Sequence, residues 1–240
     1  MSELTQRQKQ ILDKIIWEYV RSAKPVSSRL IERKYAFDIK PATIRREFAS
    51  LTEAGLVEQP HTSAGRVPTD KAYRLFVDEL LELLEQDSEQ AEPRANAEQL
   101  QVRNVDNLHI LWQLARDLAE ASSALVVARL LEDELEVCEG WSRVIRQPEF
   151  TDQRSLLALT RVLDQLGQRM DDLAEELPSA GLRVFIGKEC GLASSAGLSL
   201  MFTGSQLGQQ HAILALVGPK RMDYARNIRL IKELTALLNV

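Results

Sequence analysis

The sequence predicts an α+β protein with a small helical domain at the N-terminus and a larger mixed body. Residues 1–84 show helical periodicity, interrupted by two short apolar runs. Residues 85–99 contain no aliphatic or aromatic side chain larger than alanine, so we expect a solvated linker at 85–104. Residues 105–240 mix helical patterns with short strand patterns, which predicts a sheet-containing domain.

Composition limits the classes of protein to consider. The 240 residues are 45% hydrophobic, which indicates a folded core. No apolar run approaches the roughly 18–20 residues needed to cross a bilayer, and the N-terminus lacks the apolar segment of a signal peptide. Cys138 and Cys190 are the two cysteines, too few for a disulfide framework or a metal cluster. We therefore expect a cytoplasmic protein.

Charge is distributed unevenly along the chain. Residues 1–74 contain 14 Lys and Arg against 9 Asp and Glu, a net of +5, which leaves 16 against 26, or −10, for residues 75–240. A basic N-terminal part on an acidic body is typical of a nucleic-acid module joined to a partner-binding module.

A short helix is expected between Pro41 and Gly55. Proline suits the first helical position, and glycine suits the left-handed residue that ends a helix. Ile44, Phe48 and Leu51 recur at i, i+4 and i+7, so they form one buried stripe.

The opposite face of this helix carries small residues and arginine. Ala42, Arg46, Ala49 and Ser50 lie there, with Thr43 and Arg45 beside them. Such a face can enter a major groove closely, where arginine pairs with guanine and serine or threonine contacts bases or phosphate. An ordinary amphipathic helix with solvated arginines would give the same pattern.

The residues after this helix favour the nucleic-acid interpretation. A strand is expected at 56–60, a polar turn at 61–65 and a way out through residues 66–68, with Gly65 and Arg66 at the tip of the wing and Thr69 capping the next helix. A strand–turn–strand unit directly after a third helix is the plan of a winged helix. The candidate DNA-binding residues are Lys40, Thr43, Arg45, Arg46, Ser50, His61, Thr62, Ser63, Gly65 and Arg66.

Several runs of the chain resemble the heat-inducible transcription repressor family (HrcA). They are PATIRRE and EQPHTSAGRVPTDKAYR in the first domain, and QPEF, RVFIG and GPKRMDYAR in the body. The resemblance implies a winged helix-turn-helix domain and a GAF-like C-terminal domain, here with a reduced middle region around residues 124–140. It also implies a homodimer that binds an inverted-repeat operator on double-stranded DNA upstream of chaperone genes, with the chaperonin as a partner.

The chain departs from the family pattern at two positions of the expected interface. Lys40 stands where many members have serine, so it cannot cap the helix but can reach a phosphate. Arg46 stands where asparagine is common, at the centre of the exposed face, so we expect a different operator preference.

The elements of the body follow from shorter patterns. Strands are expected at 124–131, 135–138, 182–186, 198–203 and 211–217, and long helices at 152–177 and after residue 218. In the first domain, Thr5 and Gln8 form a capping box, and Ser27 or Ser28 caps a second helix.

No catalytic, metal or cofactor constellation is evident, so we do not expect an enzyme. The three histidines lack metal-site spacing. Residues 204–208 resemble a phosphate loop only in their glycines, and a hairpin connection explains them better. Residues 132–134 are acidic, as a solvated turn would be. The alternative function is a metabolite-responsive winged-helix regulator, because a GAF-like body can hold a sensor pocket.

Overall fold

The computed structural model describes residues 4–35, 37, 41–90, 107–133, 135–176, 181–207 and 210–238. The chain forms two compact units, residues 1–80 and 81–240. We describe each unit by itself.

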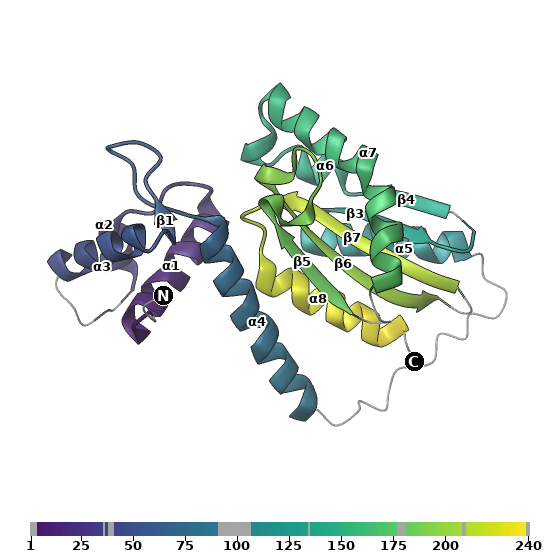
Figure 1. Cartoon of the computed structure of the whole chain (residues 1–240), viewed down its shortest axis with the longest axis horizontal. Coiled ribbons are helices and arrows are strands. Elements are labelled where there is room, and N and C mark those ends of the chain that lie inside the picture. Colours follow the sequence, from purple (N-terminus) through teal and green to yellow (C-terminus); the bar gives the residue numbers. More distant parts are fainter. Residues whose placement is uncertain are drawn as a thin grey trace. The chain divides into compact units, whose positions relative to one another are not determined.

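The first unit contains three helices, a two-stranded sheet and the start of a fourth helix (Figure 1). These elements are α1 (Gln6–Ser22), α2 (Ser28–Lys34), α3 (Pro41–Glu53), β1 (Val57–Glu58), β2 (Val67–Pro68) and α4 (Asp70–Gln90). The predicted capping box is present, since Thr5 Oγ1 accepts from Gln8 N and Thr5 N donates to Gln8 Oε1. Ser27 caps α2, accepting from Leu30 N at 3.2 Å.

One apolar core holds the helices of this unit together. The predicted stripe of α3 is confirmed: Ile44, Phe48 and Leu51 are 1%, 6% and 0% exposed. Burying side chains of this size stabilises the unit by about 1.5–3 kcal/mol each. The helices and strands around that stripe contribute Ile11, Ile15, Ile16, Ile31, Leu56, Tyr73 and Val77.

The second unit is built on a five-stranded antiparallel sheet in the order β4-β3-β7-β6-β5. Its strands are β3 (Leu125–Leu130), β4 (Leu135–Glu139), β5 (Leu182–Ile186), β6 (Leu198–Leu207) and β7 (Gln210–Pro219). Its helices are α5 (Asn107–Ser122), α6 (Trp141–Val144), α7 (Gln153–Glu176) and α8 (Tyr224–Leu238), with short 3-10 turns at Pro148–Phe150, Gly187–Cys190 and Ser195–Gly197. All five predicted strands are therefore present, and the α+β class is confirmed.

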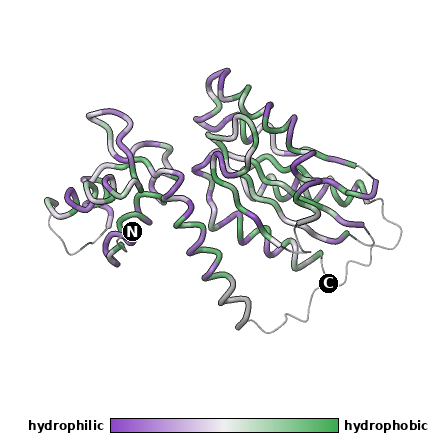
Figure 2. The backbone as a smooth tube through the Cα atoms, viewed as in Figure 1, coloured by the Kyte–Doolittle hydropathy of each residue, from purple (hydrophilic) through white to green (hydrophobic). Residues whose placement is uncertain are grey.

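Helices cover both faces of this sheet (Figure 1). Leu125 and Val127 belong to the core cluster with α7, whereas Val126 and Ala128 point to the opposite face and are equally buried. On that opposite face the sheet contacts α5 and α8. Burial on both sides explains why the central strands read as almost continuous apolar runs, which Figure 2 shows in its hydrophobic colours.

Two elements are longer than the sequence pattern predicted. Helix α4 continues to Gln90, so the first six residues of the expected linker, 85–90, are helical, and residues 91–104 of that linker lie outside the described residues. Strand β6 continues to Leu207, because Gly204 pairs with Ile213 and Leu207 with Gln210 of β7. Most of the suspected phosphate loop is thus strand, and the predicted hairpin joins β6 to β7.

Candidate nucleic-acid interface

Helix α3 presents one exposed stripe of small and basic residues. Ala42, Arg45, Arg46 and Ala49 are exposed at spacing i, i+3, i+4 and i+7. Thr43 and Ser50, at the sides of this stripe, are partly exposed, and Lys40 lies outside the described residues. The structure therefore places the described helix residues of the predicted set on or beside one exposed face of α3.

The two arginines of the stripe are available for an external anion. Within the described part of the chain, neither Arg45 nor Arg46 makes an ion pair. The nearest acidic residue of the helix, Glu47, accepts from Arg7 Nη1 at 3.5 Å on the side facing α1. Guanidinium groups in this state keep their donors for bidentate contacts with bases or phosphates.

The wing is a short hairpin whose turn is exposed. Strand β1 pairs with β2 through Val57–Pro68 and Glu58–Val67. His61, Thr62 and Ser63 are exposed in the turn, which Ala64 N closes by donating to His61 O at 2.8 Å. These three predicted site residues thus lie together at the end of the hairpin.

Gln59 holds the turn in shape, a role that the sequence analysis did not predict. Its Nε2 donates to Thr62 O at 2.9 Å and to Ala64 O at 3.0 Å. One side chain therefore satisfies two carbonyl groups that the turn leaves unpaired. A glutamine before a proline has no characteristic pattern that would have revealed this role.

Gly65 and Arg66 lie at the base of the wing, which corrects their expected place at its tip. Val26 N donates to Arg66 O and Arg66 N donates to Val26 O, both at 2.8 Å. A Cβ added to Gly65 would lie 2.4 Å from the backbone carbonyl of Val26, so this close approach requires glycine. The bridge, formed by a residue 40 positions away, sets the position of the wing base.

The side chain of Arg66 connects the wing to α3. Its Nε donates to Thr52 Oγ1 at 3.0 Å, and Thr52 Oγ1 donates to Phe48 O at 2.8 Å. Arg66 is partly buried by this contact. It therefore orients α3 against the wing, a role that exists whether or not the remaining guanidinium donors reach DNA.

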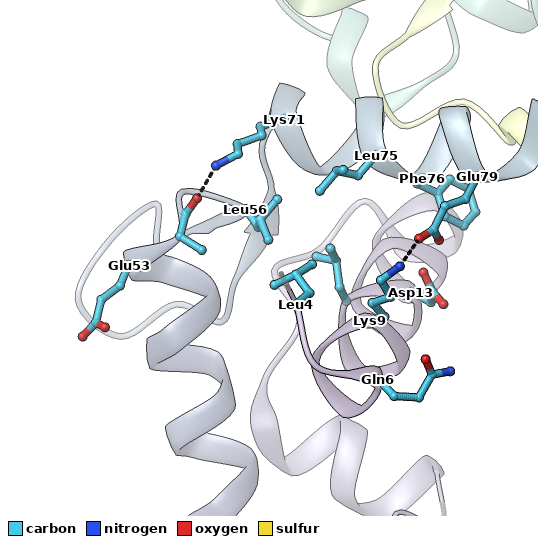
Figure 3. A pocket seen from close by; sticks show the side chains of 12 residues that line it. Leu4, Gln6, Lys9, Asp13, Glu53, Leu56, Lys71, Leu75, Phe76 and Glu79 are labelled. Carbon is cyan, nitrogen blue, oxygen red and sulfur yellow. Dashed lines mark hydrogen bonds and ion pairs between the residues drawn. The ribbon is translucent and has the colours of Figure 1, made fainter. Parts of the chain in front are cut away.

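A separate hollow of about 760 Å³ lies among α1, the end of α3 and the start of α4 (Figure 3). Lys9 Nζ bridges its wall by donating to Glu79 Oε1 at 2.9 Å. Burial, reinforced by the neighbouring Glu79 carboxylate, raises the pKa of Asp13 to about 6, although Lys14 and Lys9 oppose this.

The two cysteines and His211 of the second unit make contacts within the fold. Burial raises the pKa of Cys138 to about 11 and also raises that of Cys190, so both thiols stay protonated near neutral pH. His211 Nδ1 lies 2.6 Å from Glu132 Oε1. No group of three or more potential metal ligands occurs in the described ranges.

Two family models match the sequence. The model of the winged helix-turn-helix transcription repressor, HrcA DNA-binding, matches residues 3–82, and that of the HrcA protein C terminal domain matches residues 52–228. The chain belongs to the HrcA family. Its winged helix is therefore the DNA-binding domain of a heat-inducible transcription repressor, and the exposed stripe of α3 belongs to that domain.

Two HrcA relatives align with this chain over all or nearly all of its length. The heat-inducible transcription repressor HrcA of Geobacter sulfurreducens is 26% identical, covering 100% of this chain and 98% of the relative. That of Desulforudis audaxviator is 29% identical, covering 98% and 97%. The former alignment has 336 positions against 240 residues here, so 96 positions have no counterpart in this chain. The reduced length noticed in the sequence is thus a property of this family member.

Other relatives match a shorter part of the chain at higher identity. The HrcA repressor of Natranaerobius thermophilus is 54% identical over 78 residues, which is 32% of this chain and 23% of the relative. A solved structure titled as a hypothetical protein shares the fold, with a TM-score of 0.75 and 20% identity over 98% of this chain and 96% of that one. Among the described helices, none is long and apolar enough to cross a membrane.

Proposed function

We propose that this repressor binds an inverted-repeat operator upstream of chaperone genes as a homodimer in the cytoplasm. The observation that carries the proposal is the exposed stripe with Arg45 and Arg46 beside an exposed wing turn. A single winged helix contacts few base pairs, and an inverted repeat matches a twofold protein. Residues 1–84 supply the DNA contacts, and residues 105–240 supply regulation and dimerisation.

The proposed contacts divide into base reading and backbone binding. Arg46, exposed on the stripe of α3, and Thr43, partly exposed beside it, read base edges. Arg45 and Arg66 bind the phosphate backbone, and Lys40 and Ser50 assist them. The wing residues His61, Thr62 and Ser63, with Gly65 at the base, complete the interface.

The decisive experiment replaces the proposed base-reading arginine. Arg46→Ala should weaken binding to the cognate operator by about 1–3 kcal/mol and relax sequence preference, because one bidentate contact is lost. Arg45→Ala is the matched control on the same stripe: it should weaken all sequences alike and reduce the salt dependence. An unchanged ratio of specific to non-specific binding in Arg46→Ala would refute the assignment.

The heat response is proposed to reside in the stability of residues 100–240. A domain's net stability is a small difference between large terms, so moderate warming can unfold it and separate the two DNA-binding units. Chaperonin that refolds this part would restore repression, whereas chaperonin occupied by other damaged proteins could not. This mechanism needs no cofactor and no bound ligand.

Operator binding across a temperature ramp tests this mechanism. Binding should fall on warming and return when chaperonin and ATP are present. Binding that persists far above the growth temperature and ignores chaperonin would refute thermal release. A small-molecule sensor would then be the better explanation, and thermal-shift screening would look for its ligand.

A further inference from the structure

Glu18 is the only charged residue among the buried residues that the structure describes, with 6% of its surface exposed. It lies near the C-terminal end of α1, where its Oε1 accepts from Lys34 Nζ at 2.6 Å and from Tyr35 Oη at 2.5 Å. Although burial raises the pKa of Glu18, these two hydrogen bonds hold it below the ordinary value of 4.5, so the carboxylate is ionised at neutral pH. A buried charge is costly unless it is paired, so this carboxylate stays where its two donors are.

The two donors stand where α2 ends and the chain leaves for α3. Lys34 is the last residue of α2, and Tyr35 is its C-cap. The ring of Tyr35 is held from two further sides, since Lys14 Nζ lies 5.2 Å from its centroid and the ring of Phe37 lies at 6.3 Å. Pro41, the first residue of α3, follows Tyr35 by only six positions. The Glu18 contact therefore anchors to α1 the short segment that leads into α3.

Helix α3 thus has a directional anchor near each of its ends. Near its C-terminal end, Thr52 Oγ1 accepts from Arg66 Nε at 3.0 Å. Between the ends, α3 is held by its buried apolar stripe, and apolar packing is non-directional. Satisfied buried polar contacts add the geometric precision that apolar packing lacks. Arg45 and Arg46 lie in the first half of α3, nearer to the end that the Glu18 contact anchors.

We propose that Glu18, with its donors Lys34 and Tyr35, is a positioning group for sequence reading, which fixes the first half of α3 so that Arg46 and Thr43 reach base edges. This proposal deepens the base reading of the proposed function and rests on it. Side chains that read a site must be held within about 0.5 Å of their productive positions. Phosphate contacts carry no sequence information and supply the non-specific affinity. Loss of the Glu18 contact should therefore weaken specific binding more than non-specific binding.

Glu18→Gln tests the positioning role in the full chain, because it removes the charge and keeps the size of the side chain. Affinity is measured for a duplex that the parent protein selects from random sequence, and for a scrambled duplex of the same length and composition. The ratio of the two affinities should fall about tenfold, with scrambled binding changed less than about twofold. Tyr35→Phe, a milder change that removes one hydroxyl, should lower the ratio about threefold.

Glu79→Gln is the matched control. Glu79 Oε1 also accepts from a lysine of another helix, Lys9 Nζ at 2.9 Å, but this contact joins α1 to α4. The Glu79→Gln ratio should stay within about twofold of the parent ratio. A general loss of stability lowers the folded fraction and so weakens both affinities alike, which leaves their ratio unchanged. The ratio therefore separates positioning from stability.

Hydrogen exchange of the free protein provides a second measurement. In Glu18→Gln, the amides of residues 45–48 of α3 should exchange at least about threefold faster than in the parent, because their end of the helix has lost its anchor. The amides of residues 11–15 of α1 should keep the parent rates. Unchanged exchange at 45–48 would count against the anchor.

The outcomes separate this proposal from the proposed function. If Glu18→Gln and Tyr35→Phe keep the parent ratio, or if Glu79→Gln lowers it as far, the positioning role is refuted and the DNA-binding repressor stands. A selected sequence without an inverted repeat would refute the proposed operator, and a lowered ratio on that sequence would still support the positioning role. A parent protein that does not distinguish the selected from the scrambled duplex would overturn both.

Discussion

Replacing the partly buried carboxyl of Asp13 should change how the stability of the DNA-binding unit depends on pH. The folded pKa of about 6 exceeds the ordinary value of 3.8, so the folded state binds the proton more tightly than the unfolded state. The contribution of Asp13 to stability is therefore greatest below the ordinary value and falls as pH rises from about 4 to 6. Asp13→Asn carries no charge and should not show this fall.

The magnitude follows from the same two values. The difference between the folded pKa of about 6 and the ordinary pKa of 3.8 corresponds to at most about 3 kcal/mol. Asp13 is only partly buried, so solvent screening reduces the expected gain to about 1 kcal/mol. Asp13→Asn should thus match the parent near pH 4 and exceed it by about 1 kcal/mol at pH 7.

Urea unfolding followed by Trp17 fluorescence measures this difference. Trp17 packs edge-on against Phe76 of α4, with ring centroids 6.2 Å apart, so it reports on the first unit. Trp112→Phe and Trp141→Phe remove the tryptophans of the second unit from the signal. A gap between Asp13→Asn and parent that stays constant from pH 4 to 7 would refute the reasoning.

Two further substitutions test one contact within the first unit and one within the second unit. Gly65→Ala should cost about 1–3 kcal/mol by urea unfolding, because its Cβ would lie 2.4 Å from the Val26 carbonyl; Gly197→Ala, with open space around it, is the control. Arg221→Ala should cost about 1.5–3 kcal/mol by thermal unfolding, because its Nη2 donates to Glu149 Oε2 at 2.9 Å in a partly buried pair. Equal stabilities of Gly65→Ala and Gly197→Ala, or an unshifted Arg221→Ala transition, would contradict these assignments.

Local chemistry made much of the fold predictable. The capping box at Thr5, the buried stripe of α3 and the five strands of the body each follow from spacing within a few residues. Long-range pairing explains what the sequence did not predict. Gly204 and Ser205 have low strand propensity, yet pairing with β7 keeps them in β6.

The candidate site was predictable to a similar extent. Helical geometry alone placed Arg46 and its neighbours on one exposed face. The wing base depends instead on a bridge to Val26 from a different part of the chain, so Gly65 and Arg66 were assigned to the wrong end of the hairpin. The two carbonyls that Gln59 satisfies become visible only when the turn is folded.

The central position of β7 has a consequence for synthesis on the ribosome. The first unit makes its contacts within residues 1–80, so it can fold soon after it emerges. Strand β3 must wait for β7, because Leu125 pairs with Val217, 92 residues later. At roughly 5–20 residues per second, the nascent β3–β4 hairpin stays without its inner neighbour for on the order of 5–20 seconds. Each new molecule therefore passes through a period in which the DNA-binding unit is folded while the sheet of the second unit is not yet fully paired.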